Sequence, residues 1–340
     1  MSIVGGLDVH RAQITYDHLD TVTGEVEVGR IVPATRVELR DWLSRFEGRE
    51  AAFATEGCTG WRFVVEELQH AGVEAHLAEP ADTATLRGRK KRAKTDRADA
   101  RHLRALLIED RLPESWIPPA HVLETRIKGR AYVALMDHRR AWQQRIQAQL
   151  FHQGVEKRRG LLTEAGRAHL DEAELSGAGR QLIEVALRVI DALGAEADPL
   201  HRELQGFARR QGGCRALVDE LYGVGELTAA IIWAEMGDTR RFSSSDQAVR
   251  HTGLDITVYE SDGKRSPGRL SRQGPSTLRW ALFEAALTAT RNSSPDHGYY
   301  LEVAERLGPK RAYLSVARKL ARRVHHILRG LGDTAFEEVT

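Results

Sequence analysis

The first hundred residues alternate strand-like and helix-like segments, and this alternation restricts the fold more than any other feature of the chain. The segment IVGGLDVH is typical of a buried strand, and AQITYDHL and EVEVGRIV follow with apolar residues at alternate positions. The turn residues TVTG separate the second and third segments. Three strands joined by short turns predict an antiparallel meander.

A different pattern follows the meander. Two amphipathic helical segments, RVELRDWLSRF and GWRFVVEELQHAG, alternate with two strand segments, AAFATEG and VEAHLAE. Helices that alternate with strands in this way are typical of an α/β sheet. We therefore expect an α/β N-terminal domain with a mixed sheet over residues 1–112.

The middle of the chain is predicted to be helical. From about Val122 to Phe151 there is no proline and apolar residues recur at helical intervals. A second helical stretch runs from about Leu182 to Ala208, with an interruption near Pro199. Residues 113–212 are therefore interpreted as an antiparallel hairpin or coiled coil, with a plain helical bundle as the alternative.

The last third, residues 213–335, is also predicted to be mainly α. Gly223 and Gly225 precede a helical run, which is the form of a helix-hairpin-helix that binds phosphate through backbone amides, or of a simple turn between helices. The polar stretch YESDGKRSPGRLSRQGPS precedes a helix that Pro275 or Ser276 would begin. The chain closes with a helix whose apolar stripe lies beneath basic positions, which are Arg318, Lys319, Arg322 and Arg323.

The distribution of charge is more informative than the formal net charge of +2. Between Arg87 and Arg104 there are nine Lys or Arg residues and two Asp residues. Such a segment attracts phosphates, so we expect it to bind nucleic acid. The predicted nucleic-acid-binding residues in this segment are Arg87, Arg89, Lys90, Lys91, Arg92, Lys94 and Arg97.

Several other classes of protein are not supported by the sequence. Cys58 and Cys214 lie far apart and belong to no Cys/His cluster, so neither a zinc site nor a disulfide framework is predicted. No segment has the pattern of a signal peptide or the length of a membrane span. We expect a cytoplasmic protein with no membrane partner.

Four acidic residues are candidates for one catalytic site. Asp8 ends the first predicted strand, Glu56 ends the strand AAFATEG, and Asp96 and Asp99 lie three positions apart on a predicted helix. Four converging carboxylates would repel one another unless cations lay between them. Two magnesium ions, with manganese as a substitute, would fit these oxygen ligands and could activate a nucleophile that attacks a phosphodiester. Taken singly, each acid is equally compatible with a cap or a solvated ion pair.

These motifs resemble a known family. GLDVH with Asp8, ATEGCTGW with Glu56 and KTDRADARHLRALL with Asp96 and Asp99 resemble the four-acid, RuvC-like N-terminal domain of the IS110/IS1111 family of insertion-sequence transposases, which are related to the Piv DNA invertase. The segment from GVGELTAAIIWAEMGD to STLRWALFEAA resembles the second transposase domain of that family. The resemblance covers nearly the whole chain.

The resemblance implies a ribonuclease-H-like (RuvC-like) N-terminal fold, a coiled-coil middle and a helical C-terminal domain. It implies DNA recombination at a metal site formed by Asp8, Glu56, Asp96 and Asp99, with a serine nucleophile that forms a transient 5′-linked protein–DNA intermediate. The partners that it implies are donor and target DNA, a guiding bridge RNA, and further copies of the chain in a dimer or tetramer.

Ser261, in YESDGK, matches the family's nucleophilic serine. A serine hydroxyl is a poor nucleophile unless a base or a metal activates it, so we expect this serine to dock against the four acids of its own or another protomer. Lys264, Arg265, Arg269 and Arg272 would then hold phosphates. Other serines in the C-terminal part are alternatives for the nucleophile, namely Ser243, Ser244, Ser245, Ser266, Ser271 and Ser276.

Three alternative functions remain open from the sequence. A RuvC-like structure-specific endonuclease or DNA invertase without guide RNA would use the same acids, with water as the nucleophile of the endonuclease. An actin-like phosphotransferase would need a second glycine-rich phosphate loop, which is not found after Glu56. An RNA-binding scaffold would leave Asp96 and Asp99 without a role.

Overall fold

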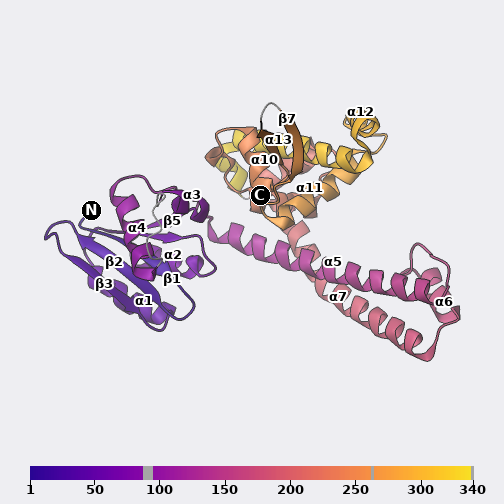
Figure 1. Ribbon diagram of the computed structural model, residues 1–340, viewed down its shortest axis with the longest axis horizontal. Helices are drawn as coiled ribbons and strands as arrows, with labels where there is room; N and C mark the ends of the chain where they lie inside the picture. Colours follow the sequence, from indigo (N-terminus) through magenta and orange to yellow (C-terminus); the bar gives the residue numbers. More distant parts are fainter. Residues whose placement is uncertain (87–94, 262–263, 338–340) are drawn as a thin grey trace. The chain divides into compact units, whose positions relative to one another are not determined.

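The computed structural model describes residues 1–86, 95–261 and 264–337, with only the backbone described at 258–261 and 264–267. The chain divides into two compact units, Met1–Ile117 and Pro118–Thr340. The first unit is an α/β sheet domain and the second is mostly helical (Figure 1).

The first unit contains a mixed five-stranded sheet in the order β3-β2-β1-β4-β5. The first three strands form the predicted antiparallel meander, and β4 and β5 extend the sheet in parallel with β1. The strands are β1 (Ile3–Val9), β2 (Ile14–Asp20), β3 (Val26–Ile31), β4 (Ala51–Glu56) and β5 (Glu74–Ala78). The predicted mixed sheet is therefore confirmed.

Helices cover both faces of this sheet. On one face, α1 (Arg36–Leu43) and α2 (Trp61–His70) enclose the larger apolar core, which includes Leu7, Ile14, Trp42, Phe53 and Leu68. On the other face, α4 (Asp96–Ile108) packs against β1, β2 and β4, and α3 (Pro80–Thr85) precedes it in the chain.

Gly6 explains why α4 can lie so close to the sheet. A Cβ atom at this position would lie 2.1 Å from the carbonyl oxygen of Ala100 and 2.8 Å from the amide nitrogen of Arg104, both in the backbone of α4. Only a residue without a side chain permits this approach. The close packing holds the first turn of α4 over the end of β1.

The second unit is built on two long helices. The helices α5 (Ala120–His152) and α7 (Gly177–Arg210) run side by side in opposite directions, and the short helix α6 (Glu164–Glu172) lies between them in sequence (Figure 1). Ile146, Leu150, Leu170 and Ile183 form an apolar cluster among these three helices. The predicted helical hairpin is present, and the later helix α9 (Glu226–Met236) packs against both of its long helices.

One detail of the hairpin prediction is wrong. Pro199 was expected to interrupt the second helix, but α7 continues through it. Proline removes the hydrogen bond to the carbonyl four residues earlier, that of Ala195, and both residues are exposed, so water can replace the lost bond. Burial of Ala197 and Leu204 against neighbouring helices stabilises the segment on either side of the proline.

The last two helices of the chain pack against each other, and three of the other remaining helices pack directly against the apolar helix α9. Its Trp233 is fully buried beside Phe207 and Phe336, and its indole nitrogen donates a hydrogen bond to the carbonyl oxygen of Ala335 at 2.7 Å. The helices of this part are α8 (Gly212–Glu220), α9 (Glu226–Met236), α10 (Ser245–Thr252), α11 (Ser276–Ala289), α12 (His297–Leu307) and α13 (Pro309–Leu331), with 3-10 turns at Thr239–Arg241 and Gly332–Phe336. Another 3-10 turn, at Ser44–Phe46, follows α1 in the first unit.

A β-hairpin interrupts the helices. The strands β6 (Ile256–Ser261) and β7 (Lys264–Leu270) pair in antiparallel register, with Ser261 opposite Lys264. The sequence prediction treated this stretch as a polar segment without strands. Asp262 and Gly263, which lie outside the described residues, are the dipeptide most typical of hairpin turns and carried the signal that was overlooked.

Candidate functional site

The central strands of the sheet bring two of the four predicted acids together. Asp8 lies on β1 and Glu56 ends β4, and the two strands are parallel neighbours with Leu7 opposite Thr55. Side chains alternate between the faces of a strand. Because Leu7 and Phe53 belong to the core beneath α1 and α2, Asp8 and Glu56 are directed to the face covered by α4.

The helix α4 brings the other two acids. Thr95 begins it as the N-cap residue, and its hydroxyl accepts a hydrogen bond from the amide of Ala98 at 3.2 Å. Asp96 and Asp99 both lie in the first turn of the helix. The partial positive charge of a helix N-terminus stabilises carboxylates there, so this is a favourable place for two acids.

The four acids line one cavity of about 900 Å³. Its apolar wall includes Val9, Ala34 and Phe63. The remaining lining residues are His10, Arg11, Cys58, Thr59 and Gly60. Residues that are up to 91 positions apart in sequence, from Asp8 to Asp99, thus face one volume that can admit a phosphate group and its counterions.

Burial and nearby negative charges disfavour the ionised form of Asp8. Its side chain is 17% exposed. Burial raises the pKa of Asp8 most, His10 lowers it, and the negative charges of Asp99 and Asp96 raise it further, with a net upward shift. A bound cation would offset this shift, because it stabilises the ionised carboxylates.

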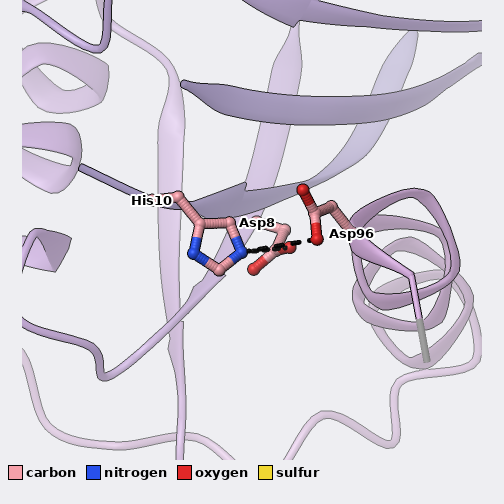
Figure 2. Close-up of side chains that lie close together, drawn as sticks. All are labelled: Asp8, His10 and Asp96. Atoms are coloured by element: carbon pink, nitrogen blue, oxygen red, sulfur yellow. Dashed lines mark hydrogen bonds and ion pairs between the residues drawn. The ribbon is translucent and has the colours of Figure 1, made fainter. Parts of the chain in front are cut away.

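His10 links two of the acids (Figure 2). Its Nε2 atom lies 3.2 Å from Oδ2 of Asp8 and 3.6 Å from Oδ1 of Asp96. Gln13 donates a hydrogen bond from Nε2 to the other oxygen of Asp96, Oδ2, at 2.9 Å. One ligand atom from each of Asp8, His10 and Asp96 can be chosen so that all three lie within 4.8 Å of one another, which fits a divalent cation.

Sequence reasoning missed His10 and Gln13. The signal for His10 was present in GLDVH, because residues two positions apart on an extended chain lie on the same face and Asp8 had already been selected. Gln13 offered no such signal, since its contact with Asp96 joins residues 83 positions apart.

The basic segment around the acids is only partly described. Arg87, Arg89, Lys90, Lys91, Arg92 and Lys94 lie outside the described residues. Arg97 is exposed on α4, where a phosphate could reach it.

Two other basic residues of the segment have a structural role that its charge count did not reveal. Arg101 and Arg104 donate hydrogen bonds through Nε to the fully buried Asp17, at 3.2 and 2.5 Å. They fix α4 to β2 and neutralise a buried charge. The positive charge of the segment is therefore not all directed to a ligand.

The predicted nucleophile lies in the second unit. Ser261 is the last residue of β6, and its side chain is not among the described ones. The same is true of the side chains of Lys264, Arg265 and the alternative nucleophile Ser266. Two other alternative nucleophiles form hydrogen bonds within the second unit. The hydroxyl of Ser244 caps α10 through the amide of Gln247, and that of Ser271 bonds to the carboxylate of Asp255.

Two other predicted phosphate ligands line a groove at the base of the hairpin. Arg269 and Arg272 share this cavity of about 450 Å³ with Arg311 and Arg318 of α13, which were not predicted to be phosphate ligands. Burial lowers the pKa of Arg318, whose Nε donates to the carbonyl oxygen of Leu254 at 2.6 Å. Four guanidinium groups around one groove favour a polyanion.

Arg272 also has an unusual backbone. Its φ angle is 55°, in the left-handed region that residues other than glycine rarely adopt. Its amide donates to the carbonyl oxygen of Gly253 at 3.1 Å, which holds this conformation. Strained residues of this kind are frequent at binding sites.

Gly223 and Gly225, the predicted helix-hairpin-helix residues, have roles that need no phosphate. A Cβ atom on Gly223 would lie 2.5 Å from the carbonyl oxygen of Ala285 in α11, and its φ is +96°. Gly225 is the N-cap of α9, and its amide already donates to the hydroxyl of Thr228 at 3.0 Å. The simple turn between helices, which was the alternative interpretation, accounts for both residues.

The chain is similar to known transposases. Residues 215–301 match the family model described as Transposase IS116/IS110/IS902 family. A putative transposase, y4rJ, of Sinorhizobium fredii is 29% identical over 243 residues, which are 64% of this chain and 60% of that protein. The transposase for insertion sequence element IS1111A of Coxiella burnetii is 31% identical over 123 residues, which are 35% of this chain and 34% of that protein.

A third relative, a probable family 20 transposase of Pseudomonas aeruginosa, is 26% identical over 102 residues, 30% of each chain. The aligned part of this chain thus spans less than two thirds of each of these relatives. Together with the family match, the relatives confirm the resemblance to the IS110 family that the motifs indicated.

Proposed function

We propose that this relative of the IS110-family transposases is the transposase of an insertion sequence, which cuts and rejoins DNA by metal-dependent phosphoryl transfer. The observation that carries the proposal is the convergence of Asp8, Glu56, Asp96 and Asp99 on one cavity. The mixed sheet, with acids at the ends of two central strands, supports a ribonuclease-H-like (RuvC-like) fold for the first unit.

The four carboxylates of the cavity, taken alone, suit Mg²⁺, with Mn²⁺ as a substitute. The side chains of Asp8, Glu56, Asp96 and Asp99 would hold the ions, and a cation there would offset the burial and the neighbouring negative charges that raise the pKa of Asp8. When bound, two such ions supply polarisation of the phosphate and of the attacking and leaving oxygens.

Ser261 is the proposed nucleophile. Its Oγ would attack phosphorus while the bond from phosphorus to the 3′ oxygen breaks, so that the 3′ oxygen leaves with a proton and the 5′ end stays on the serine. Attack by another 3′ hydroxyl would reverse these steps and join the strands. Each transfer exchanges one P–O bond for another, so no energy-supplying cofactor is needed.

The nucleic-acid partners are donor and target DNA and, by resemblance, a bridge RNA. The groove of Arg269, Arg272, Arg311 and Arg318 supports phosphate binding by the second unit, and exposed Arg97 supports it near the acids. Assembly as a dimer or tetramer is part of the proposal. In the part of the chain that the structure describes, no helix is both long and apolar enough to span a membrane.

The test is recombination by the purified chain. Donor and target DNA are incubated with and without Mg²⁺, and with and without RNA transcribed from DNA that flanks the gene. The proposal expects joined products that require both additions, and a covalent protein–DNA adduct that Ser261→Ala abolishes and Ser244→Ala does not. Cleavage without an adduct would favour an endonuclease with a water nucleophile, and joining without RNA would favour an unguided invertase.

A further inference from the structure

We infer that His10 is itself a metal ligand and that it gives this carboxylate site a preference for Mn²⁺ over Mg²⁺. The inference rests on the proposed function, because it concerns the same cation site. It adds a nitrogen ligand that the four-acid prediction does not contain.

The backbone holds His10 in a fixed place at the site. His10 directly follows β1, and its amide donates to the carbonyl oxygen of Gln13 at 2.9 Å, which continues the pairing of β1 with β2 past the end of the strands. The extended backbone therefore puts the side chains of His10 and Asp8 on the same face. The imidazole is 54% exposed and lines the cavity, so a ligand in the cavity can reach it.

The distances suit shared coordination. Two ligand atoms at right angles about an ion, with bonds of about 2.1 Å, lie about 3 Å apart. The Nε2 atom of His10 is 3.2 Å from Oδ2 of Asp8 and 3.6 Å from Oδ1 of Asp96 (Figure 2). Small adjustments of two side chains at the cavity surface would bring all three atoms onto one ion.

A nitrogen ligand changes which metal the site prefers. Mg²⁺ binds oxygen ligands and tolerates little departure from octahedral geometry, whereas imidazole nitrogen is a better ligand for transition metals. Mn²⁺ accepts both carboxylate oxygen and imidazole nitrogen. A set of two carboxylates and one histidine therefore favours Mn²⁺, and Glu56 and Asp99 line the same cavity.

The direct test uses Mn²⁺ as the probe and the full chain without nucleic acid. Electron-spin-echo modulation of bound Mn²⁺ detects a directly coordinated nitrogen, and protein made with ¹⁵N-histidine identifies that nitrogen as histidine without any substitution. We expect histidine nitrogen modulation in the unaltered chain and its loss in His10→Gln. Competition with Mg²⁺ should show that His10→Gln weakens Mn²⁺ binding about tenfold and changes Mg²⁺ binding far less.

The matched control is His102→Gln. His102 lies on α4 in the same unit, but its Nε2 donates to the carbonyl oxygen of Thr83 at 3.2 Å and it does not line the cavity. This variant should retain both the modulation and the Mn²⁺ affinity.

The outcomes separate this inference from the proposed function. Mn²⁺ that binds without histidine modulation, or with modulation that persists in His10→Gln, overturns the role of His10 and leaves the four-acid site intact. The role of His10 is also overturned if Asp96→Asn loses Mn²⁺ and Mg²⁺ binding while His10→Gln keeps the metal preference of the unaltered chain. That result too would leave the four-acid site intact. Failure of the unaltered chain to bind either metal overturns both proposals.

Discussion

At the scale of single residues, Asp8 is a proposed metal ligand whose ionised form lowers the stability of the folded chain. Asp8 stays protonated to a higher pH in the folded state than in the unfolded state, because burial and the charges of Asp99 and Asp96 raise its pKa. Ionisation of Asp8 therefore lowers the free energy of unfolding as the pH rises through the raised pKa. Active sites commonly accept such a cost, which a bound substrate or ion then offsets.

The variant Asp8→Asn should consequently be more stable than the unaltered chain in metal-free buffer at pH 7, by about 1 kcal/mol, because it removes a partly buried charge. Mg²⁺ should raise the melting temperature of the unaltered chain more than that of the variant at the same concentration, because the variant binds the ion more weakly. Thermal unfolding followed by circular dichroism, with and without Mg²⁺, provides the measurement.

Asp20→Asn is the control, and its expected effect on stability at pH 7 is opposite to that of Asp8→Asn. The guanidinium of Arg49, 2.7 Å away, lowers the pKa of Asp20, so its ionised form favours the folded state above the ordinary aspartate pKa. This substitution should lower stability at pH 7 and leave the effect of Mg²⁺ unaltered. If both Asn variants were destabilised alike, the account of Asp8 would be wrong.

At the scale of elements, the position of α4 depends on Gly6. A methyl group there would meet the backbone of Ala100, which cannot move without displacing the whole helix. Gly6→Ala should therefore lower the free energy of unfolding by about 1–3 kcal/mol and should weaken metal binding, since Asp96 and Asp99 move with α4. Urea unfolding and calorimetric titration with Mg²⁺ would measure the two effects.

Gly194→Ala serves as the comparison. Gly194 lies inside α7 and nothing lies within 4 Å of the position that a Cβ would take. This substitution should stabilise the chain by about 0.5–1 kcal/mol, because alanine favours the helix. A destabilising effect of similar size in both variants would contradict the packing argument.

The hairpin groove gives a third prediction at this scale. Arg272→Gly relieves a left-handed backbone, so stability should stay the same or rise by up to about 1 kcal/mol, while the loss of a guanidinium should weaken nucleic-acid binding. The dependence of log affinity on log salt should become shallower by about 1. Filter binding of labelled DNA at several salt concentrations is the appropriate measurement.

Arg322→Ala is the control for the groove, because Arg322 pairs with Asp246 at 2.9 Å and does not line it. Its affinity for DNA and its salt dependence should match those of the unaltered chain. Equal losses of affinity in the two variants would show that the groove has no special role.

At the scale of the whole molecule, the sequence predicted the local helices and strands better than the tertiary contacts between them. The strand and helix periodicities near the N-terminus, and the two long helices, predicted what the structure contains. The β-hairpin was missed because its polar composition resembles a loop, and the continuation of α7 through Pro199 depends on tertiary packing that no local pattern reveals.

The same difference of scale applies to the candidate site. Asp8, Glu56, Asp96 and Asp99 were selected from their places at the ends of predicted elements, and they line one cavity. Gln13, Arg311 and Arg318 were not selected, because each reaches its site through contacts between distant segments. The role of Arg101 and Arg104 with the buried Asp17 likewise depends on how α4 packs on β2, which their charge alone could not indicate.

The most direct test of the central claim is calorimetric titration of Mg²⁺ into the metal-free chain and into Asp8→Asn, Glu56→Gln, Asp96→Asn and Asp99→Asn. If the four carboxylates form one cation site, the unaltered chain binds saturably, and each substitution weakens that binding by about tenfold or more while circular dichroism shows an intact fold. Binding that is undiminished in Asp8→Asn or in Asp96→Asn would contradict the account.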